Sequence, residues 1–511
     1  MSWFRDGTRL LISGTVGPGD HEHETTSIWL VSILGGAPRK LRDGAYRANL
    51  SPDDSLVAYM GMKGSIWLAD ADGENPREFI GAEEWEFLGS PDWSSDGKRV
   101  VYRRLGPSET GAQATIESRG LDEETSTVLV RDENFRFTNV GLAFIADFLM
   151  LDDRLVYVMD EPAPRNRDQN LWEIAIDPRS GKPIGEPRRI TDLVDFSILD
   201  LSVTADGSHL AFLNDRGQTD VYIGELGDGG RSLDNARRLT LDDRDDSPSC
   251  WTPDSRAVVF QSDRNGNDDL LVQGLDQRNA QDLAIGAGNQ SGPHLTPDGR
   301  FFLYWDWESP ANAGGPNVLS RLLRVPVGGG PTELVVEVQG GAWIDCATTP
   351  DGPCLLAEVR RAEKIVTLSR LDPVAGRGEE LFRIDIGSAI RGKPALSPDG
   401  GRFAMIGQGK DRSIRLQDAL TGEFIRDIDV DGLPGVTFNE VEWSPDGSGF
   451  YLAGESPRAL SLLRVDLNGE AHVLHEDPTG AFSSVRPSPD GRHLAFEKTT
   501  QDTNVWVIED F

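Results

Sequence analysis

Several residue types and motifs that would indicate catalysis are scarce or missing from this sequence of 511 residues. Three cysteines are too few for a disulfide scaffold, and no apolar run reaches the ~18 residues of a membrane span. The sequence contains no Gly-x-Ser-x-Gly nucleophile turn, no phosphate loop ending in Gly-Lys-Ser or Gly-Lys-Thr, no kinase catalytic loop, no CxxC pair and no HExxH. We therefore predict a protein that is not an enzyme and that carries no cofactor and no metal.

Positive charge is also in short supply. The chain has 51 basic and 84 acidic residues, which gives a formal net charge of −33. Such a surface repels nucleic acid and anionic lipid, so we expect neither as a partner.

Turn-forming residues, by contrast, are abundant. The chain has 56 glycines and 30 prolines, and it lacks long stretches of helical periodicity, a combination that favours many short strands. The stretch Val441 to Gly454 shows the pattern best, because apolar residues alternate on both sides of Ser444-Pro445-Asp446-Gly447. Pro445 presets φ for a type I turn, and Gly447 accepts the strained exit position. This stretch predicts two half-buried strands joined by a tight turn.

The same turn recurs along the whole chain at a mean spacing of about 48 residues, which is typical of a four-stranded propeller blade. A degraded copy lies around Asp152. The ten clear copies are marked by their turn aspartates, to which we assign a structural role: Asp6, Asp53, Asp96, Asp206, Asp254, Asp298, Asp351, Asp399, Asp446 and Asp490. The sequence thus predicts an all-β fold, a β-propeller array of about eleven four-stranded blade repeats.

Eleven repeats exceed the four to eight blades of one ring, so we expect two propellers. The first would comprise about four units in residues 1–195, in a ring completed elsewhere, and the second about seven blades in residues 196–511. A single ring that takes blades from both ends of the chain is the alternative. The last repeat stops at Phe511 without an outer strand, and Met1 already lies within a repeat. We therefore expect the missing strand upstream, in a longer protein.

Cys346 and Cys354 flank the turn Thr349 to Gly352 almost symmetrically. They could be bridged across a hairpin, but we favour two small buried hydrophobic residues. Cys250 is expected to pack within a strand.

The repeats resemble those of TolB-type propellers. The copies that carry the resemblance are CWTPDSRAVVFQSDRNGNDDLLVQGLD (250–276), SVTADGSHLAFLNDRGQTDVYIGELGDG (202–229) and SPDGRHLAFEKTTQDTNVWVIEDF (488–511). The resemblance implies a non-catalytic scaffold that binds a protein, a peptide or another ligand. It also implies a periplasmic or other extracytoplasmic location, as in the C-terminal propellers of bacterial sensor kinases and regulators. The alternative is the gating propeller of a prolyl-oligopeptidase-like peptidase whose catalytic domain is absent.

Variable loops on one propeller face are the expected binding surface, because such loops vary freely over a rigid scaffold. Exposed tryptophan beside carboxylates suits a peptide, a glycan or a cationic partner. The candidate ligand-binding residues are Asp215, Arg216, Asp245, Asp246, Asp263, Arg264, Trp305 and Trp307. The alternative is that these residues only tie loops together.

Two further stretches contain several possible metal ligands. His21-Glu22-His23-Glu24 is the densest group of possible ligands, and Asp242 to Asp246 offers several carboxylates. Ordering a flexible loop around a metal costs conformational entropy, and the second stretch lacks a calcium-loop spacing. We expect no specific metal at either.

Overall fold

The computed structural model confirms an all-β chain built from blade-like sheets. It describes all residues except 15–25, 62–63, 84–85, 109–110, 133–147, 163–167, 178–179, 195–196, 205–206, 308–318, 361–364, 386–390, 408–412, 431–432, 434–435, 457–458 and 510–511. Within these described ranges, no helix is long and apolar enough to cross a membrane. The turn aspartate Asp206 and the cluster His21 to Glu24 lie outside the described residues.

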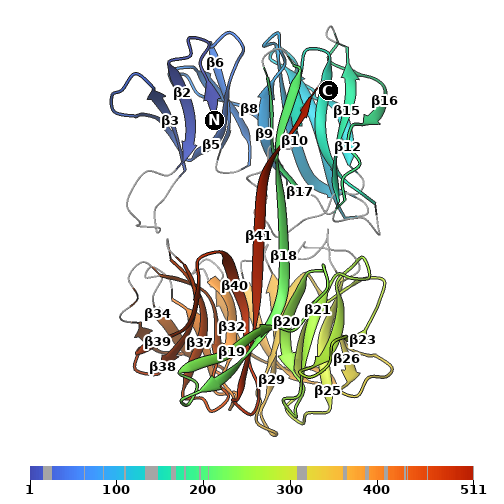
Figure 1. Ribbon diagram of the computed structural model, residues 1–511, viewed down its shortest axis with the longest axis vertical. Helices are drawn as coiled ribbons and strands as arrows, with labels where there is room; N and C mark the ends of the chain where they lie inside the picture. Colours follow the sequence, from blue (N-terminus) through green and yellow to red (C-terminus); the bar gives the residue numbers. More distant parts are fainter. Residues whose placement is uncertain are drawn as a thin grey trace. The chain divides into compact units, whose positions relative to one another are not determined.

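The chain forms two compact units. Unit 1 comprises Met1–Arg216 together with Asp502–Phe511, and unit 2 comprises Gly217–Gln501. The boundary falls inside two long strands, β18 (His209–Gly227) and β41 (His493–Glu509), which are hydrogen-bonded neighbours (Figure 1). Each of these strands contributes one part to unit 1 and the other part to unit 2.

Unit 1 contains four antiparallel four-stranded sheets, and a fifth sheet begins with β17 (Ser197–Val203) and the first part of β18. The inner strands β1, β5, β9, β13 and β17 contact one another in succession. The strands of the four sheets are β1 (Ser2–Trp3), β2 (Arg9–Gly14), β3 (Ser27–Ser32) and β4 (Arg39–Asp43); β5 (Ala45–Leu50), β6 (Leu56–Gly61), β7 (Ile66–Asp70) and β8 (Arg77–Ile80); β9 (Phe87–Trp93), β10 (Arg99–Ser108), β11 (Gly111–Gly120) and β12 (Thr127–Asp132); β13 (Phe148–Met150), β14 (Arg154–Asp160), β15 (Gln169–Ile176) and β16 (Pro183–Arg189).

Unit 2 contains five complete four-stranded sheets. Their strands are β20 (Asp246–Trp251), β21 (Ala257–Ser262), β22 (Asp269–Gly274) and β23 (Gln281–Ala284); β24 (Asn289–Leu295), β25 (Phe301–Trp307), β26 (Leu319–Pro326) and β27 (Glu333–Gln339); β28 (Gly341–Cys346), β29 (Cys354–Arg360), β30 (Ile365–Asp372) and β31 (Gly376–Asp385); β32 (Arg391–Leu396), β33 (Arg402–Ile406), β34 (Ser413–Asp418) and β35 (Phe424–Asp429); β36 (Thr437–Trp443), β37 (Gly449–Glu455), β38 (Leu460–Asp466) and β39 (Ala471–Asp477).

A sixth blade of unit 2 joins distant parts of the chain. It runs from β40 (Gly480–Pro487) through the first part of β41 and the second part of β18 to β19 (Ser232–Arg238). The inner strands β40, β20, β24, β28, β32 and β36 contact one another in this order, and β36 contacts β40 again. Unit 2 is therefore a closed ring of six blades around a common axis.

This arrangement differs from the predicted division into residues 1–195 and 196–511. The repeat with its turn at Asp206 was assigned whole to the second propeller, and the final repeat was expected to lack its outer strand. In the structure, the expected loop around Asp215 is continuous strand in β18, and the last repeat contains the continuous strand β41. As a result β18 and β19 supply the outer strands beside β40 and β41. Repeat spacing alone cannot reveal a strand shared between two sheets.

The recurring turn is held by a hydroxyl and a carboxylate. Ser444 Oγ donates to Asp446 Oδ1 at 2.7 Å, and the same hydroxyl accepts the N–H of Gly449 at 3.1 Å. Asp446 Oδ1 also accepts the N–H of Ser448 at 3.0 Å. These bonds lower the pKa of Asp446, although partial burial opposes them. The hydroxyl–carboxylate bond recurs at the turns of Asp53, Asp96, Asp254, Asp298, Asp399 and Asp490.

Tryptophans placed just before the turn join neighbouring blades. Trp443 Nε1 donates to the carbonyl of Ala395 at 3.0 Å, and Trp251 Nε1 donates to that of Arg486 at 2.8 Å. Both rings are 3% exposed. Each indole therefore buries its apolar body between two sheets and satisfies its polar group on the adjacent inner strand.

The two cysteines that flank the turn at Asp351 are bridged. Cys346 and Cys354 are paired across β28 and β29, and a disulfide joins them. The favoured interpretation of two unbridged hydrophobic residues is therefore wrong, because the hairpin register places the two residues directly opposite each other. Cys250 is free and lies in β20, as expected.

The turn bonds predict the effect of one substitution. Asp446→Ala should lower the free energy of unfolding by about 1 kcal/mol, the usual contribution of a local hydrogen bond, in urea titrations. Asp351→Ala is the matched control, because the described part of the structure records no hydrogen bond to the Asp351 carboxylate, and it should cost less. Equal losses in the two variants would contradict the assignment.

Candidate functional site

Six ionisable side chains from the inner strands of unit 2 meet around the ring axis, and we call them the axial cluster. They come from five of the six inner strands that form the ring, namely β24, β28, β32, β36 and β40, and β20 contributes none of them. Because each lies on an inner strand, ring closure brings them together from distant parts of the sequence. The members are His294, Asp345, Lys393, Glu440, Glu442 and Arg486.

 Four of these strands, β24, β28, β32 and β40, contribute one residue each, and the fifth, β36, contributes both glutamates.

One half of the axial cluster is a chain of three side chains. His294 Nδ1 lies 3.3 Å from Asp345 Oδ1, and His294 Nε2 lies 2.6 Å from Lys393 Nζ. Asp345 is anchored from behind, because its two oxygens accept the N–H groups of Cys346 and Leu396, each at 2.9 Å. The imidazole therefore bridges a fixed carboxylate and an amine. Since β28 lies between β24 and β32, the contact between His294 and Lys393 passes over one blade.

The other half of the axial cluster is centred on a guanidinium. Arg486 Nη1 lies 2.7 Å from Glu440 Oε1 and 3.7 Å from Glu442 Oε2. Its Nε donates to the carbonyl of Ser249 at 2.9 Å. Arg486 thus connects its own strand β40 to both neighbouring inner strands, β36 and β20, and its pKa is raised by the two glutamates in spite of burial.

Enclosure within the ring changes the acidities of these groups. Burial lowers the pKa of Lys393 and that of His294 and raises the pKa of Glu442 to about 7. Burial also opposes ionisation of Asp345, but its bond with His294 and the nearby charges lower its pKa overall. Water still reaches the cluster, because the side chains of Asp345 and Glu442 are 14% and 30% exposed and Lys393 is exposed. The cluster is a solvated polar site rather than a sealed core.

The sequence analysis missed the axial cluster, although the repeat contains a signal for it. His294, Glu442 and Arg486 stand four residues before the turn aspartates of their repeats, and Asp345, Lys393 and Glu440 stand six before. Alternate residues of a strand point to the same side. Reading these two positions across all repeats would have collected the residues that face the axis.

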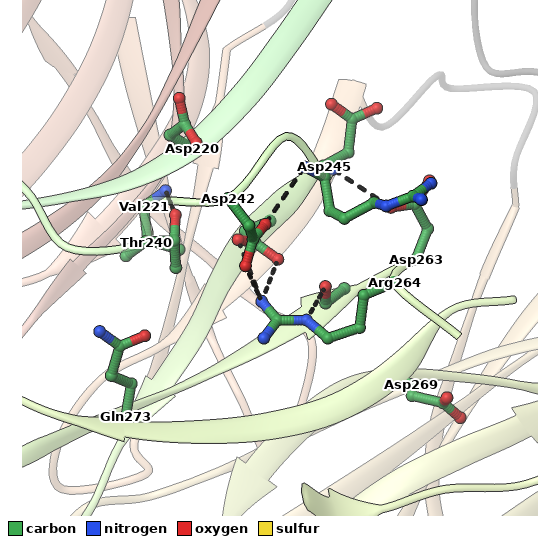
Figure 2. A network of polar contacts seen from close by, with 12 residues as sticks. Asp220, Val221, Thr240, Asp242, Asp245, Asp263, Arg264, Asp269 and Gln273 are labelled. Atoms are coloured by element: carbon green, nitrogen blue, oxygen red, sulfur yellow. Dashed lines mark hydrogen bonds and ion pairs between the residues drawn. The ribbon is translucent and has the colours of Figure 1, made fainter. Parts of the chain in front are cut away.

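Four of the predicted ligand-binding residues do lie together. Arg264 Nη2 lies 3.2 Å from Asp246 and 3.0 Å from Asp242, and Asp245 N–H donates to Asp263 Oδ1 at 3.2 Å (Figure 2). Asp246 is fully buried, and burial raises its pKa to about 6. These contacts tie the segment before β20 to the segment after β21, which is the alternative, structural role.

A surface pocket of about 370 Å³ lies beside this network. Asp242, Arg264, Gln273 and Arg278 are among the residues that line it. Arg278 is exposed, whereas the guanidinium of Arg264 is engaged by two carboxylates. The predicted loop surface therefore keeps one hollow that a ligand could enter.

The other predicted residues lie elsewhere. Trp305 is 4% exposed, and Trp307, which is half-buried, packs against it and donates from Nε1 to Ser291 Oγ at 2.8 Å. Asp215 and Arg216 lie in β18 within unit 1, where Asp215 Oδ1 accepts the hydroxyl of Thr503 at 2.6 Å. The role of these four residues in binding stays a prediction.

The described residues include no group of three or more histidine, cysteine or acidic side chains arranged to hold a metal ion.

Comparisons with known proteins find likeness of fold. No family model matches the chain. An uncharacterized protein of Agrobacterium fabrum is 25% identical over 163 residues, which are 30% of this chain and 53% of that protein, so the chain spans about half the length of this relative. A putative TolB from Agrobacterium tumefaciens has 15% identity and a TM-score of 0.42, covering 55% of this chain and 98% of that one. TolB from Acinetobacter baumannii has 13% identity and a TM-score of 0.37, covering 80% and 82%.

The four-stranded sheets and the closed ring of unit 2 confirm the predicted propeller fold. At these identities and scores the comparisons support no statement about function.

The acidity of Glu442 predicts a pH dependence of stability. Its pKa of about 7 in the folded chain lies above the ordinary value of 4.5, so the folded state holds this proton more tightly than the unfolded state does. The contribution of Glu442 to the free energy of unfolding is therefore greatest below about pH 4.5 and is lost as the pH rises towards 7. We expect the melting temperature of Glu442→Gln to fall less between about pH 5 and pH 8 than that of the parent protein, when both are measured in the same buffers.

Glu476→Gln on β39 is the matched control, because Glu476 is exposed and lies outside the axial cluster. It removes the same charge and should leave the slope of melting temperature against pH close to that of the parent. A slope in Glu442→Gln that equals the parent's would show that Glu442 does not hold its proton as described.

Proposed function

We propose that the chain is a ligand-binding propeller array without catalytic turnover, and that the axial cluster of unit 2 is its binding site. The observation that carries this proposal is the convergence of six ionisable side chains on one solvated site. A structural cluster would bury its charges in pairs, because an unpaired buried charge is costly. Here one half of the cluster, around Arg486, is paired in this way, whereas Lys393 meets a histidine and remains exposed.

A polar ligand suits this arrangement. Glu442 can donate or accept a hydrogen bond because its pKa is about 7, and Lys393 supplies an amine. The inner strands that carry both groups are hydrogen-bonded within their sheets, so little conformational entropy is lost when a ligand binds. We propose a small polar molecule, or a polar segment of a peptide or protein, as the ligand.

We also propose an extracytoplasmic location. The disulfide between Cys346 and Cys354 supports it, because disulfides persist in oxidising compartments and are rare in the cytosol. The strongly acidic composition makes anionic lipid and nucleic acid poor partners.

The binding site can be tested by thermal stabilisation. The probes are a panel of free amino acids, dipeptides, sugar acids and 2-oxo acids, each added to the parent protein. We expect at least one class to raise the melting temperature, and we expect Lys393→Met and Glu442→Gln to abolish that rise. Arg278→Ala, at the pocket beside Arg264, should leave it intact. The reverse pattern would move the binding site to the loop surface, and a panel without any effect would count against a small polar ligand.

The location has its own test. Protein expressed with a periplasmic leader should yield only one cysteine, Cys250, to alkylation after unfolding, and all three after reduction. Reduction should also lower the free energy of unfolding by about 2.5 kcal/mol, the loop-closure value for so short a loop. Full alkylation of Cys346 and Cys354 without reductant would contradict the bridge and remove its support for the location.

A further inference from the structure

The contact between Lys393 and His294 determines which of the two nitrogens carries the shared proton and which accepts it. The two nitrogens are 2.6 Å apart, which is the distance of a strong hydrogen bond. Two positively charged groups cannot share such a bond, so one of them must accept. Asp345 faces the other ring nitrogen, Nδ1, and we assign the Nδ1 proton to that contact from the partners alone. His294 Nε2 is then the acceptor, and it is placed to take a proton from Lys393.

This geometry is that of an activated amine. A lysine becomes a nucleophile when it loses its proton, which burial and a nearby base favour. The side chain of Lys393 meets water, but the protein atoms of the ring that surround it and the charge of Arg486 lower its pKa, while Asp345, Glu440 and Glu442 oppose this effect. Removal of the proton by His294 would leave an imidazolium beside the ionised Asp345, an arrangement that stabilises the charge.

We propose that the axial cluster binds an aldehyde or ketone by reversible imine formation at Lys393 Nζ. The proposal rests on the proposed function and deepens it, since it names the chemical class of the ligand. It describes covalent capture of one ligand per site, not turnover.

The step balances without any additional reactant. His294 Nε2 takes one proton from the Lys393 ammonium, and the freed lone pair on Nζ forms a bond to the carbonyl carbon. The carbonyl oxygen gains two protons, one of them from His294 and the other from the nitrogen, and leaves as water when the C–O bond breaks. The products are a protonated imine and one water molecule, and the total charge is the same as in the ammonium and the carbonyl compound. Glu442, with a pKa of about 7, can relay a proton to the leaving oxygen.

Other cations of the chain have different surroundings from Lys393. Arg486 is held by Glu440 and by the Ser249 carbonyl, so it is a structural cation. Elsewhere in unit 2, Lys498 Nζ forms an ion pair with Asp477. Lys98 on unit 1 is 81% exposed and lies 3.8 Å from Asp96. These two lysines serve as references that lack a neighbouring imidazole in the described contacts.

The proposal can be tested by reductive trapping. The parent protein is incubated with pyruvate and cyanoborohydride, and the modified lysines are located by peptide mass mapping. We expect modification at Lys393 to exceed that at Lys98 and Lys498 by at least about tenfold, because a positioned base such as His294 typically accelerates proton transfer by roughly 10²–10⁴-fold. Lys393→Arg keeps the charge and should show no such preferred adduct. Equal labelling of Lys98 and Lys393 would overturn the proposal.

A second variant separates chemistry from structure. His294→Gln keeps a polar side chain at the site but cannot take a proton. At about pH 7 its trapping rate at Lys393 should fall by at least about tenfold, and at about pH 10, where lysine loses its proton unaided, the rate should approach that of the parent. A purely structural role of His294 would lower trapping at both pH values, and an unchanged rate at pH 7 would show that His294 is not the base.

The outcome also distinguishes this inference from the proposed function. If the probe panel stabilises the protein through Lys393 and Glu442 but no adduct is trapped there, the site binds its ligand without a covalent bond. If neither effect occurs, the axial cluster is not a binding site for these probes.

Discussion

Closure of the six-bladed ring is the constraint on which the rest of unit 2 depends. The hydrogen bonds that close it run between strands from distant parts of the chain, since β41, which pairs with β40, also pairs with β18, which pairs with β19. A propeller without such closure would expose the unpaired edge of a sheet. Arg486 adds side-chain contacts at the same place, because it bonds to Glu440 on one side and to the Ser249 carbonyl on the other.

Ring closure also explains why charged groups, and not a hydrophobic core, lie at the centre of the ring. The faces of adjacent blades bury apolar residues against each other, as in the cluster that contains Trp443, Phe450 and Ile428. The innermost strand positions, by contrast, bring charged side chains from neighbouring inner strands into contact with one another. Mixed charges can occupy these positions, because each cation there has an acceptor within reach.

Much of the fold could be predicted from the sequence, because its determinants are local. Pro445, Asp446 and Gly447 define a turn, and the same turn at regular spacing defines a blade. The long strands β18 and β41 could not be predicted, because local patterning around Asp215 is the same for a hairpin loop and for an uninterrupted strand. Prediction of the disulfide between Cys346 and Cys354 requires the register of the hairpin, and the flanking residues do not determine that register to within one position.

The candidate site was harder to predict for a related reason. The loop residues Asp245, Asp246, Asp263 and Arg264 were recognisable as a group from the sequence. They do lie together, but they form ion pairs and hydrogen bonds mainly with one another. The axial residues are scattered through five repeats, with one in each except for Glu440 and Glu442, which share a repeat, and none is conspicuous in its own repeat. They share only their position four or six residues before a turn aspartate. That position indicates a common site only when the inner strands are known to form a ring.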